Sequence, residues 1–257
     1  RVNPLPQGSV LAYPARKAHG TIPAMNRLPT CCSPLQHHCP LPRPVPGAQL
    51  VTCAFDPAAL RADDFQRAAI EQTPALQRSV AKRQAEYLAG RACARAALEH
   101  LDGRLYVPAT GDDRAPVWPD DIAGSITHGK GWAAAVVAHK NDCQGLGLDQ
   151  ETLLDDERAA RLAREILTEA ELQRLDPARQ GLTVTLTFSL KESLFKALYP
   201  LVLKRFYFEH AELLEWSDDG SARLRLLTDL SPDWHHGREL EGQFCLMGEQ
   251  LLSLIAI

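Results

Sequence analysis

The sequence lacks long apolar runs and a strong excess of charge of either sign. Its 257 residues contain no stretch of 18 or more consecutive apolar residues, which is the length that a membrane-spanning helix requires. A net charge of -4 at pH 7 argues against a general nucleic-acid-binding protein, whose surface is usually basic. We therefore expect a protein that has no membrane segment and no nucleic-acid partner.

The cysteines are too irregularly placed for a disulfide scaffold. There are seven, scattered along the chain, whereas disulfide-rich domains carry even numbers at short, regular spacings. We therefore expect a reducing, cytoplasmic setting. The first 24 residues have neither a methionine nor the apolar core of a secretory signal, and we interpret residues 1–24 as an upstream extension.

Proline is abundant at the start of the chain. Ten of the 18 prolines fall within residues 1–46, where they fix φ, remove backbone donors and block regular structure. We expect residues 1–46 to form an extended arm. The cysteines and histidines of residues 31–39 are an alternative zinc site, but structural zinc needs two converging chain segments and this run supplies one.

Residues 73–101 are predicted to form an amphipathic helix with a basic edge. Most of them are strong helix formers. On a helical wheel, four residues fall in one narrow apolar arc: Val80, Tyr87, Ala94 and Leu98. Arg83 and Arg91 border this arc, so their guanidinium groups can reach a neighbouring cleft. The alternative is that each belongs to a solvated basic face.

The following segments are predicted to be mostly strands. Residues 112–119 are a turn-rich connector, and residues 122–138 fit two strands around a glycine turn. Residues 145–151 fit a further strand. Because side chains alternate along a strand, Asp149 and Glu151 share one face there, about 7 Å apart.

The C-terminal part is predicted to combine helices with antiparallel strands. Residues 157–175 are helical and mainly structural, and Thr168 with Glu171 can form a capping box. Propensity does not decide between helix and strand over residues 182–199. Residues 205–257 contain short alternating runs that are typical of antiparallel strands.

Three carboxylates are the strongest chemical signal. Asp149 and Glu151 are followed about 40 residues later by Glu192, which lies one turn before Lys196. Without convincing His or Cys ligands, such a set favours a hard cation such as magnesium, which also binds substrate phosphates. The basic residues of segment 78–104 would supply other phosphate contacts. The alternatives are a solvated acidic pair and an ordinary i,i+4 helix pair.

Three ordered motifs resemble the 4'-phosphopantetheinyl transferases of the surfactin/enterobactin-synthetase type. They are GSITHG (residues 124–129), GLGLDQE (145–151) and FSLKESLFKAL (188–198). KRQAEYLAGRACARAAL (82–98) and RAPVWP (114–119) are similar to the enterobactin branch. The resemblance covers roughly residues 25–257, and three motifs in this order are much more specific than any one of them.

The resemblance implies an enzyme that transfers the 4'-phosphopantetheine group of coenzyme A to a serine hydroxyl of a carrier protein. The acceptors would be apo acyl carrier proteins and peptidyl carrier domains of fatty-acid, polyketide, nonribosomal-peptide or siderophore synthesis, and 3',5'-adenosine bisphosphate would be released. The implied fold is α+β, a monomeric pseudo-dimer of two similar halves, residues 47–144 and 145–257, with the active site in the cleft between them. It also implies that residues 188–198 are helical.

The resemblance also assigns roles to individual residues. Asp149, Glu151 and Glu192 would hold Mg²⁺ or Mn²⁺, with Glu192 as general base and Lys196 at the pyrophosphate and the leaving group. The coenzyme A phosphates would be bound by a further set: Arg83, Arg91, Arg114, Thr127 and His128. Two positions depart from the family pattern, because Gln150 replaces an apolar residue and Phe188 stands where many relatives have tryptophan.

The carrier protein would be an acidic helical bundle, so its docking surface should be basic and apolar. Candidates are the basic edge of the helix and Lys204 with Arg205. Two other functions compete with this interpretation. A magnesium-dependent hydrolase or nucleotidyl transferase would be expected to carry a glycine-rich phosphate loop, which is missing. An inactive carrier-binding module would be expected to have lost a metal ligand, and none is lost.

Overall fold

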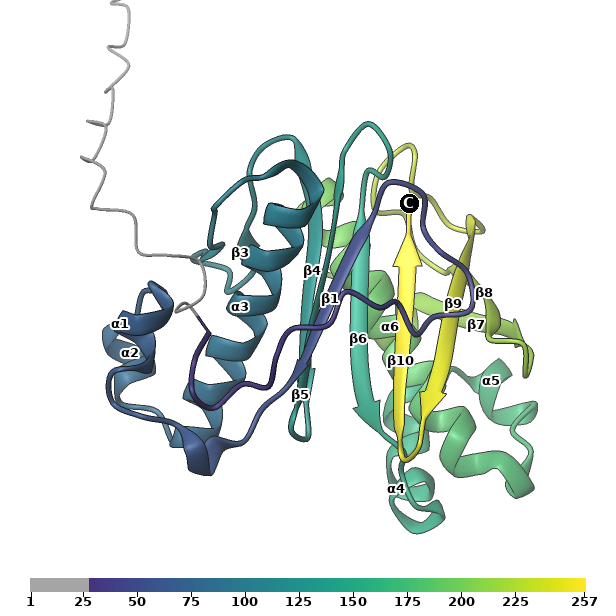
Figure 1. Ribbon diagram of the computed structural model, residues 1–257. Helices are drawn as coiled ribbons and strands as arrows, with labels where there is room; N and C mark the ends of the chain where they lie inside the picture. Colours follow the sequence, from purple (N-terminus) through teal and green to yellow (C-terminus); the bar gives the residue numbers. More distant parts are fainter. Residues whose placement is uncertain (1–27) are drawn as a thin grey trace, which may run out of the picture.

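A computed structural model of the chain describes residues 28–257. The predicted extension and the first part of the predicted arm lie outside the described residues. The fold is α+β, as expected, with two antiparallel sheets that each carry one long helix (Figure 1). None of the helices in residues 28–257 has both the length and the apolar character needed to cross a membrane.

The first sheet has three strands in the order β1-β5-β4. Its strands are β1 (Gln49–Ala54), β4 (Ile122–Gly129) and β5 (Trp132–His139). The two strands predicted around the glycine turn are thus confirmed. The long helix α3 (Ala81–Asp102) packs on β5 and β1. Smaller elements complete this layer: α1 (Asp64–Ala68), α2 (Pro74–Gln77), β2 (Ala109–Thr110) and β3 (Pro116–Val117).

The prediction of one continuous helix over residues 73–101 is wrong, because the segment forms α2 and α3 with a break between them. The Ser79 hydroxyl donates to the Leu76 carbonyl at 2.6 Å, a local bond that competes with continuation of the helix. Val80 is then extended, with ψ at 153°. Val80 is 72% exposed and so does not belong to the buried face on which it was predicted, whereas Ala94 and Leu98 are buried as expected.

The second sheet has five strands in the order β6-β10-β9-β8-β7. These are β6 (Leu146–Thr152), β7 (Ala211–Trp216), β8 (Ser221–Leu226), β9 (Glu239–Met247) and β10 (Gln250–Ala256). Three helices belong to this layer: α4 (Asp156–Ile166), α5 (Glu169–Gln173) and α6 (Gln180–Val202). The capping box of Thr168 and Glu171 is confirmed at the start of α5.

One predicted strand segment is different in the structure. Residues 205–210 are a loop that ends in a 3-10 turn, Phe208–His210, and β7 starts only afterwards. The Tyr207 backbone N–H donates to the imidazole Nδ1 of His210 at 3.0 Å. This backbone donor is therefore satisfied locally instead of by a neighbouring strand, which ends the alternating pattern as a turn.

Helix α6 forms despite its β-branched residues, as the resemblance implied. The hydroxyls of Thr185 and Thr187 donate to carbonyls four residues earlier, at 2.7 and 2.8 Å, so their polar groups are satisfied within the helix. The helix lies very close to β6, because a Cβ at Gly147 would come within 1.7 Å of the Ser193 carbonyl oxygen. Glycine at residue 147 is therefore required for this packing.

Side chains join the two sheets along β4 and β6. The Ser125 hydroxyl accepts from the Leu148 N–H at 2.9 Å, and the Thr127 hydroxyl accepts from the Gln150 N–H at 3.0 Å. Gln150 is buried against Gly129, and neither polar atom of its side-chain amide has a partner within residues 28–257. We call this contact between the two strands the β4–β6 seam. It places the end of β4 beside the carboxylates of β6.

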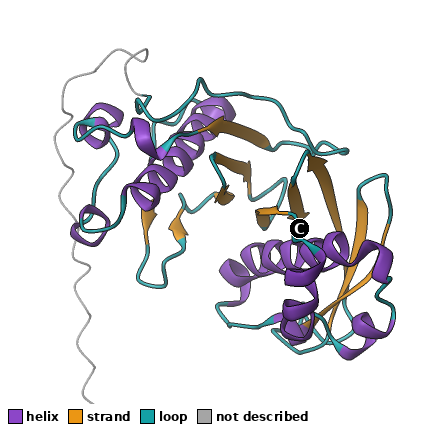
Figure 2. Cartoon of the chain, turned by 90° about the horizontal axis from the view of Figure 1, so that it is seen from below, coloured by secondary structure: helices purple, strands orange, loops and turns teal. Residues whose placement is uncertain are grey.

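The described part of the arm, residues 28–46, runs along both sheets (Figure 1). It forms one isolated bridge to β1, between Gln36 and Thr52, and another between Cys32 and Phe55, just after β1. Further on, the backbone N–H of Arg43 donates to the Gln243 side chain on β9 at 3.0 Å. Figure 2 shows the two long helices, α3 and α6, well separated in a second view, with strands between them. The arm therefore links the two sheets on the side of β1 and β9.

Candidate active site

Strand β6 and helix α6 bring the three predicted metal-binding carboxylates into one half-buried region. Burial raises the pKa of Glu151 to about 7, an effect that Asp149 strengthens, Lys196 opposes and Glu192 also strengthens. Burial likewise raises the pKa of Glu192, where Lys196 opposes and Asp149 strengthens the shift. Mutual repulsion of carboxylates in a partly desolvated position is what a bound cation relieves.

Asp149 is the most buried of the three, with 5% of its surface exposed. One of its oxygens accepts from the Lys196 ammonium at 2.6 Å, and the other accepts from the Ser189 hydroxyl at 2.9 Å. The Lys196 ammonium also donates to the Leu148 carbonyl at 3.0 Å. Lys196, expected at the pyrophosphate, is thus fixed beside the acidic residues, while its side chain also lines a cavity.

Helix α6 and β10 add three serines that the sequence analysis missed, two from α6 and one from β10. The Ser253 hydroxyl lies 2.7 Å from that of Ser189 and 2.8 Å from that of Ser193, and Ser253 is directly opposite Asp149 in the β6–β10 pairing. This chain of hydroxyls orients the Asp149 carboxylate. The i,i+4 spacing of Ser189 and Ser193 was the available signal, but it becomes informative only when β10 supplies the third hydroxyl.

A different group of side chains within residues 28–257 lies close enough together to hold a metal ion. Ligand atoms of Asp102, Asp121 and His139 all lie within 4.8 Å of one another. Arg104 already bridges the two aspartates, with 2.7 Å ion pairs to each, so one of their two negative charges is compensated. The ligand atoms of Asp149, Glu151 and Glu192 do not form such a close group among the described residues, and one Asp149 oxygen is turned toward Lys196. Their oxygen donors are of the kind that a hard cation prefers.

His128 at the end of β4 lies in a positively charged environment. Its Nε2 is 3.4 Å from the Arg83 guanidinium, and its Nδ1 is 3.9 Å from a Glu86 oxygen. Burial lowers the pKa of His128; Glu86 opposes this, whereas the charges of Arg83 and Lys196 lower it further. The Arg83 guanidinium and the charge of Lys196 favour an anion at this position, which the nearby Glu86 carboxylate partly opposes.

The other predicted phosphate-binding residues are placed less uniformly. Arg91 is buried, with its guanidinium 3.1 Å from the Thr110 hydroxyl and over the Tyr87 ring at 4.6 Å. Its Nε is buried without a partner among the described residues. Thr127 is buried in the β4–β6 seam. Arg114 is exposed between β2 and β3 and lines the cavity that Lys196 also lines.

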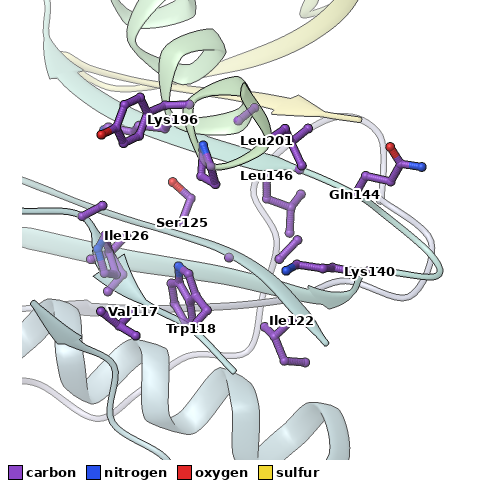
Figure 3. Close-up of a pocket in the computed structure, with 18 of the residues that line it drawn as sticks. Val117, Trp118, Ile122, Ser125, Ile126, Lys140, Gln144, Leu146, Lys196 and Leu201 are labelled. Carbon is purple, nitrogen blue, oxygen red and sulfur yellow. The ribbon is translucent and has the colours of Figure 1, made fainter. Parts of the chain in front are cut away.

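That cavity has a volume of about 530 Å³ and lies between β4 and the second half of α6. Figure 3 shows Trp118, Val117 and Ile126 on one side of it and Lys196 and Leu201 of α6 on the other. A smaller cavity of about 170 Å³ is lined by Glu192 and by residues of segment 205–208. Phe195 and Arg205 line both, so the two spaces adjoin. Apolar walls with a few cations suit an anionic organic ligand.

Comparisons with known proteins point to one family over most of the chain. A model described as "4'-phosphopantetheinyl transferase N-terminal domain" matches residues 71–138, and one described as "4'-phosphopantetheinyl transferase superfamily" matches residues 145–251. Enterobactin synthase component D of Escherichia coli (strain K12) is 39% identical over 60% of this chain and 72% of that protein.

Two further relatives agree. The 4'-phosphopantetheinyl transferase Svp of Streptomyces mobaraensis is 39% identical over 61% of this chain and 65% of its own length. The 4'-phosphopantetheinyl transferase Npt of Nocardia iowensis is 34% identical over 57% of this chain and 66% of its own length. The matched segments therefore span about two thirds of these two relatives. The resemblance carried by the three motifs is confirmed, and the chain belongs to the 4'-phosphopantetheinyl transferase superfamily.

Proposed function

We propose that this protein is an enzyme that transfers the 4'-phosphopantetheine group of coenzyme A to a serine hydroxyl of apo carrier proteins. The names of its relatives support the reaction. The observation that carries the proposal is the position of Lys196, which contacts Asp149 at 2.6 Å and lines the large cavity. Acidic groups and a space for an anionic cofactor thus meet at one side chain.

In this proposal, the basic residues around β4 bind the phosphates of coenzyme A. Arg83 and His128 form one anion-binding position, and Arg114 and Lys196 line the cavity beside it. Bidentate guanidinium contacts suit phosphate oxygens. Thr127 and Arg91 act mainly by fixing this region, since their polar atoms bond to Gln150 and Thr110.

Asp149, Glu151 and Glu192 would hold Mg²⁺ or Mn²⁺, which when bound neutralises phosphate charge during phosphoryl transfer. Glu192 takes the proton of the acceptor serine in this proposal. Its half-buried carboxylate lines the smaller cavity, and this position supports the role of general base. The serine oxygen bonds to the β-phosphorus as the bond from that phosphorus to the bridging oxygen breaks. Lys196 stabilises the charge of the departing 3',5'-adenosine bisphosphate.

The proposed architecture is a pseudo-dimer of residues 47–144 and 145–257, with the active site in the cleft between them. The similar packing of α3 on β1 and β5 and of α6 on β6 and β10 supports it. We also propose that the protein is a cytoplasmic monomer. Its acceptors would be acyl and peptidyl carrier proteins of fatty-acid or siderophore synthesis.

The test is intact-protein mass spectrometry of an apo carrier protein after incubation with the enzyme, coenzyme A and Mg²⁺. We expect a gain of one phosphopantetheine unit, lost with EDTA and with Asp149→Ala. Asp121→Ala is the matched control, because it removes a carboxylate from the other acidic cluster and should leave transfer intact. Failure of the wild-type protein to modify several carrier proteins, despite binding coenzyme A, would favour the inactive-module alternative.

A further inference from the structure

The segment between α6 and the 3-10 turn, residues 203–207, is a ridge with unusual exposure, and we call it the 203–207 ridge. Leu203 is 77% exposed and Tyr207 is 61% exposed. Lys204 and Arg205 between them are also exposed. Large apolar side chains are normally buried because water contact costs about 25 cal/mol per Å². Two of them on one short basic segment indicate a surface that a partner covers.

The backbone at Leu203 adds a second observation. Leu203 ends α6 in the left-handed region, with φ at 50° and its N–H bonded to the Tyr199 carbonyl at 2.8 Å. A non-glycine residue is disfavoured there because its Cβ crowds the following carbonyl oxygen, and glycine or asparagine is the usual choice. The protein therefore retains an exposed leucine at a position where stability favours another residue, which is typical of a functional constraint.

The ridge borders both cavities. Leu203 and Arg205 line the larger one, while Arg205 and Tyr207 line the smaller one together with Glu192. A serine hydroxyl that is to reach Glu192 has to be presented by a protein resting on a surface next to this smaller cavity. The ridge meets that geometrical condition.

The charge of the ridge indicates the chemistry of the partner. Arg205 makes no ion pair within residues 28–257, and the Lys204 ammonium donates to a backbone carbonyl, that of Asp229, at 2.6 Å. Neither positive charge is therefore compensated by a carboxylate. By comparison, the exposed Arg161 on α4 pairs with Glu157. An acidic surface would find unpaired cations at the ridge.

We infer that the 203–207 ridge is the docking surface for the acidic face of the apo carrier protein. The inference rests on the proposed function. Leu203 and Tyr207 are the apolar anchors, and Lys204 and Arg205 pair with carboxylates of the carrier. Tyrosine and arginine are over-represented among residues that dominate binding energy, and the charged pair sets orientation and association rate.

Two ridge variants test the inference by steady-state kinetics with carrier protein and coenzyme A varied separately. Lys204 lines neither cavity. Lys204→Glu should therefore raise KM for the carrier about tenfold while KM for coenzyme A stays unchanged. Leu203→Asn should also raise carrier KM more than coenzyme A KM. Its Tm should stay equal or rise, because asparagine tolerates the left-handed backbone, so a docking loss is separable from unfolding.

Arg161→Glu is the matched control, a charge reversal on α4 that should leave carrier KM unchanged. Binding of a carrier whose acceptor serine is replaced by alanine, measured by calorimetry, reports docking without chemistry and should weaken in both ridge variants. Unchanged carrier KM and binding in both variants, or a loss in Arg161→Glu alone, would overturn the inference. Absence of any transfer by the wild-type protein would instead overturn the proposed function on which it rests.

Discussion

The buried ion pair between Lys191 and Glu171 gives the most quantitative prediction. The two side chains are 2% and 5% exposed, and the Lys191 ammonium lies 2.8 Å from a Glu171 oxygen. The ammonium also donates to the carbonyls of Ile166 at 2.9 Å and Phe208 at 3.0 Å. Burial lowers the pKa of Lys191, although the Glu171 carboxylate opposes this. The pair thus ties α6 to α4, α5 and the turn before β7.

Replacing Lys191 by methionine should destabilise the protein strongly. The change leaves a buried carboxylate without its cation and removes the ammonium donor from the Ile166 carbonyl, whereas the Phe208 carbonyl still accepts from the Ala211 N–H. Removal of one partner of a buried pair costs about 3–5 kcal/mol, and each unsatisfied acceptor contributes about 1–3 kcal/mol of desolvation to that loss. Because the carboxylate still accepts from the backbone N–H groups of Thr168 and Leu213, we expect the lower half of this range.

Urea unfolding at pH 7, followed by tryptophan fluorescence, measures the effect as a change in unfolding free energy. The matched comparison is the double variant Lys191→Met with Glu171→Gln, which removes both charges and should lose less than the sum of the single variants. A loss below about 1 kcal/mol for Lys191→Met, or strict additivity of the two changes, would refute the reasoning.

Three other predictions follow from single side chains. Glu192→Gln should lower kcat by about 10²-fold or more with little change in coenzyme A affinity, and near-normal turnover in a stopped assay would remove Glu192 as the base. Although burial raises the pKa of Asp64, hydrogen bonds from Thr30 and Arg61 lower it overall, so its stabilising effect is present above the ordinary aspartate pKa and lost as pH falls through the lowered value. Urea titrations from pH 7 to pH 3 should therefore show a smaller loss for Asp64→Asn than for wild type, and equal losses would contradict this. Gly147→Ala should reduce both Tm and activity because its Cβ would meet the Ser193 carbonyl, and an unchanged melting curve would show that α6 can shift without cost.

The sequence by itself was sufficient for the features that repeat locally or occur as ordered motifs. Strands β4 and β5 were predictable because alternating residues flank a glycine turn, and the capping box of Thr168 and Glu171 because its two partners are three residues apart. The family followed from three motifs in a fixed order. The helix over residues 188–198 required that resemblance, since β-branched residues favour a strand there until the hydroxyls find carbonyls four residues back.

Only the tertiary structure decided which polar groups meet. Asp149 and Lys196 are 47 residues apart, and their 2.6 Å contact depends on α6 lying close to β6. Lys191, next to a predicted metal ligand, turns away from it to a carboxylate 20 residues earlier. Local periodicity fixes which side of an element is apolar, but the partner of a buried charge is chosen by the packing of whole elements, because desolvation must be compensated wherever the fold places that charge.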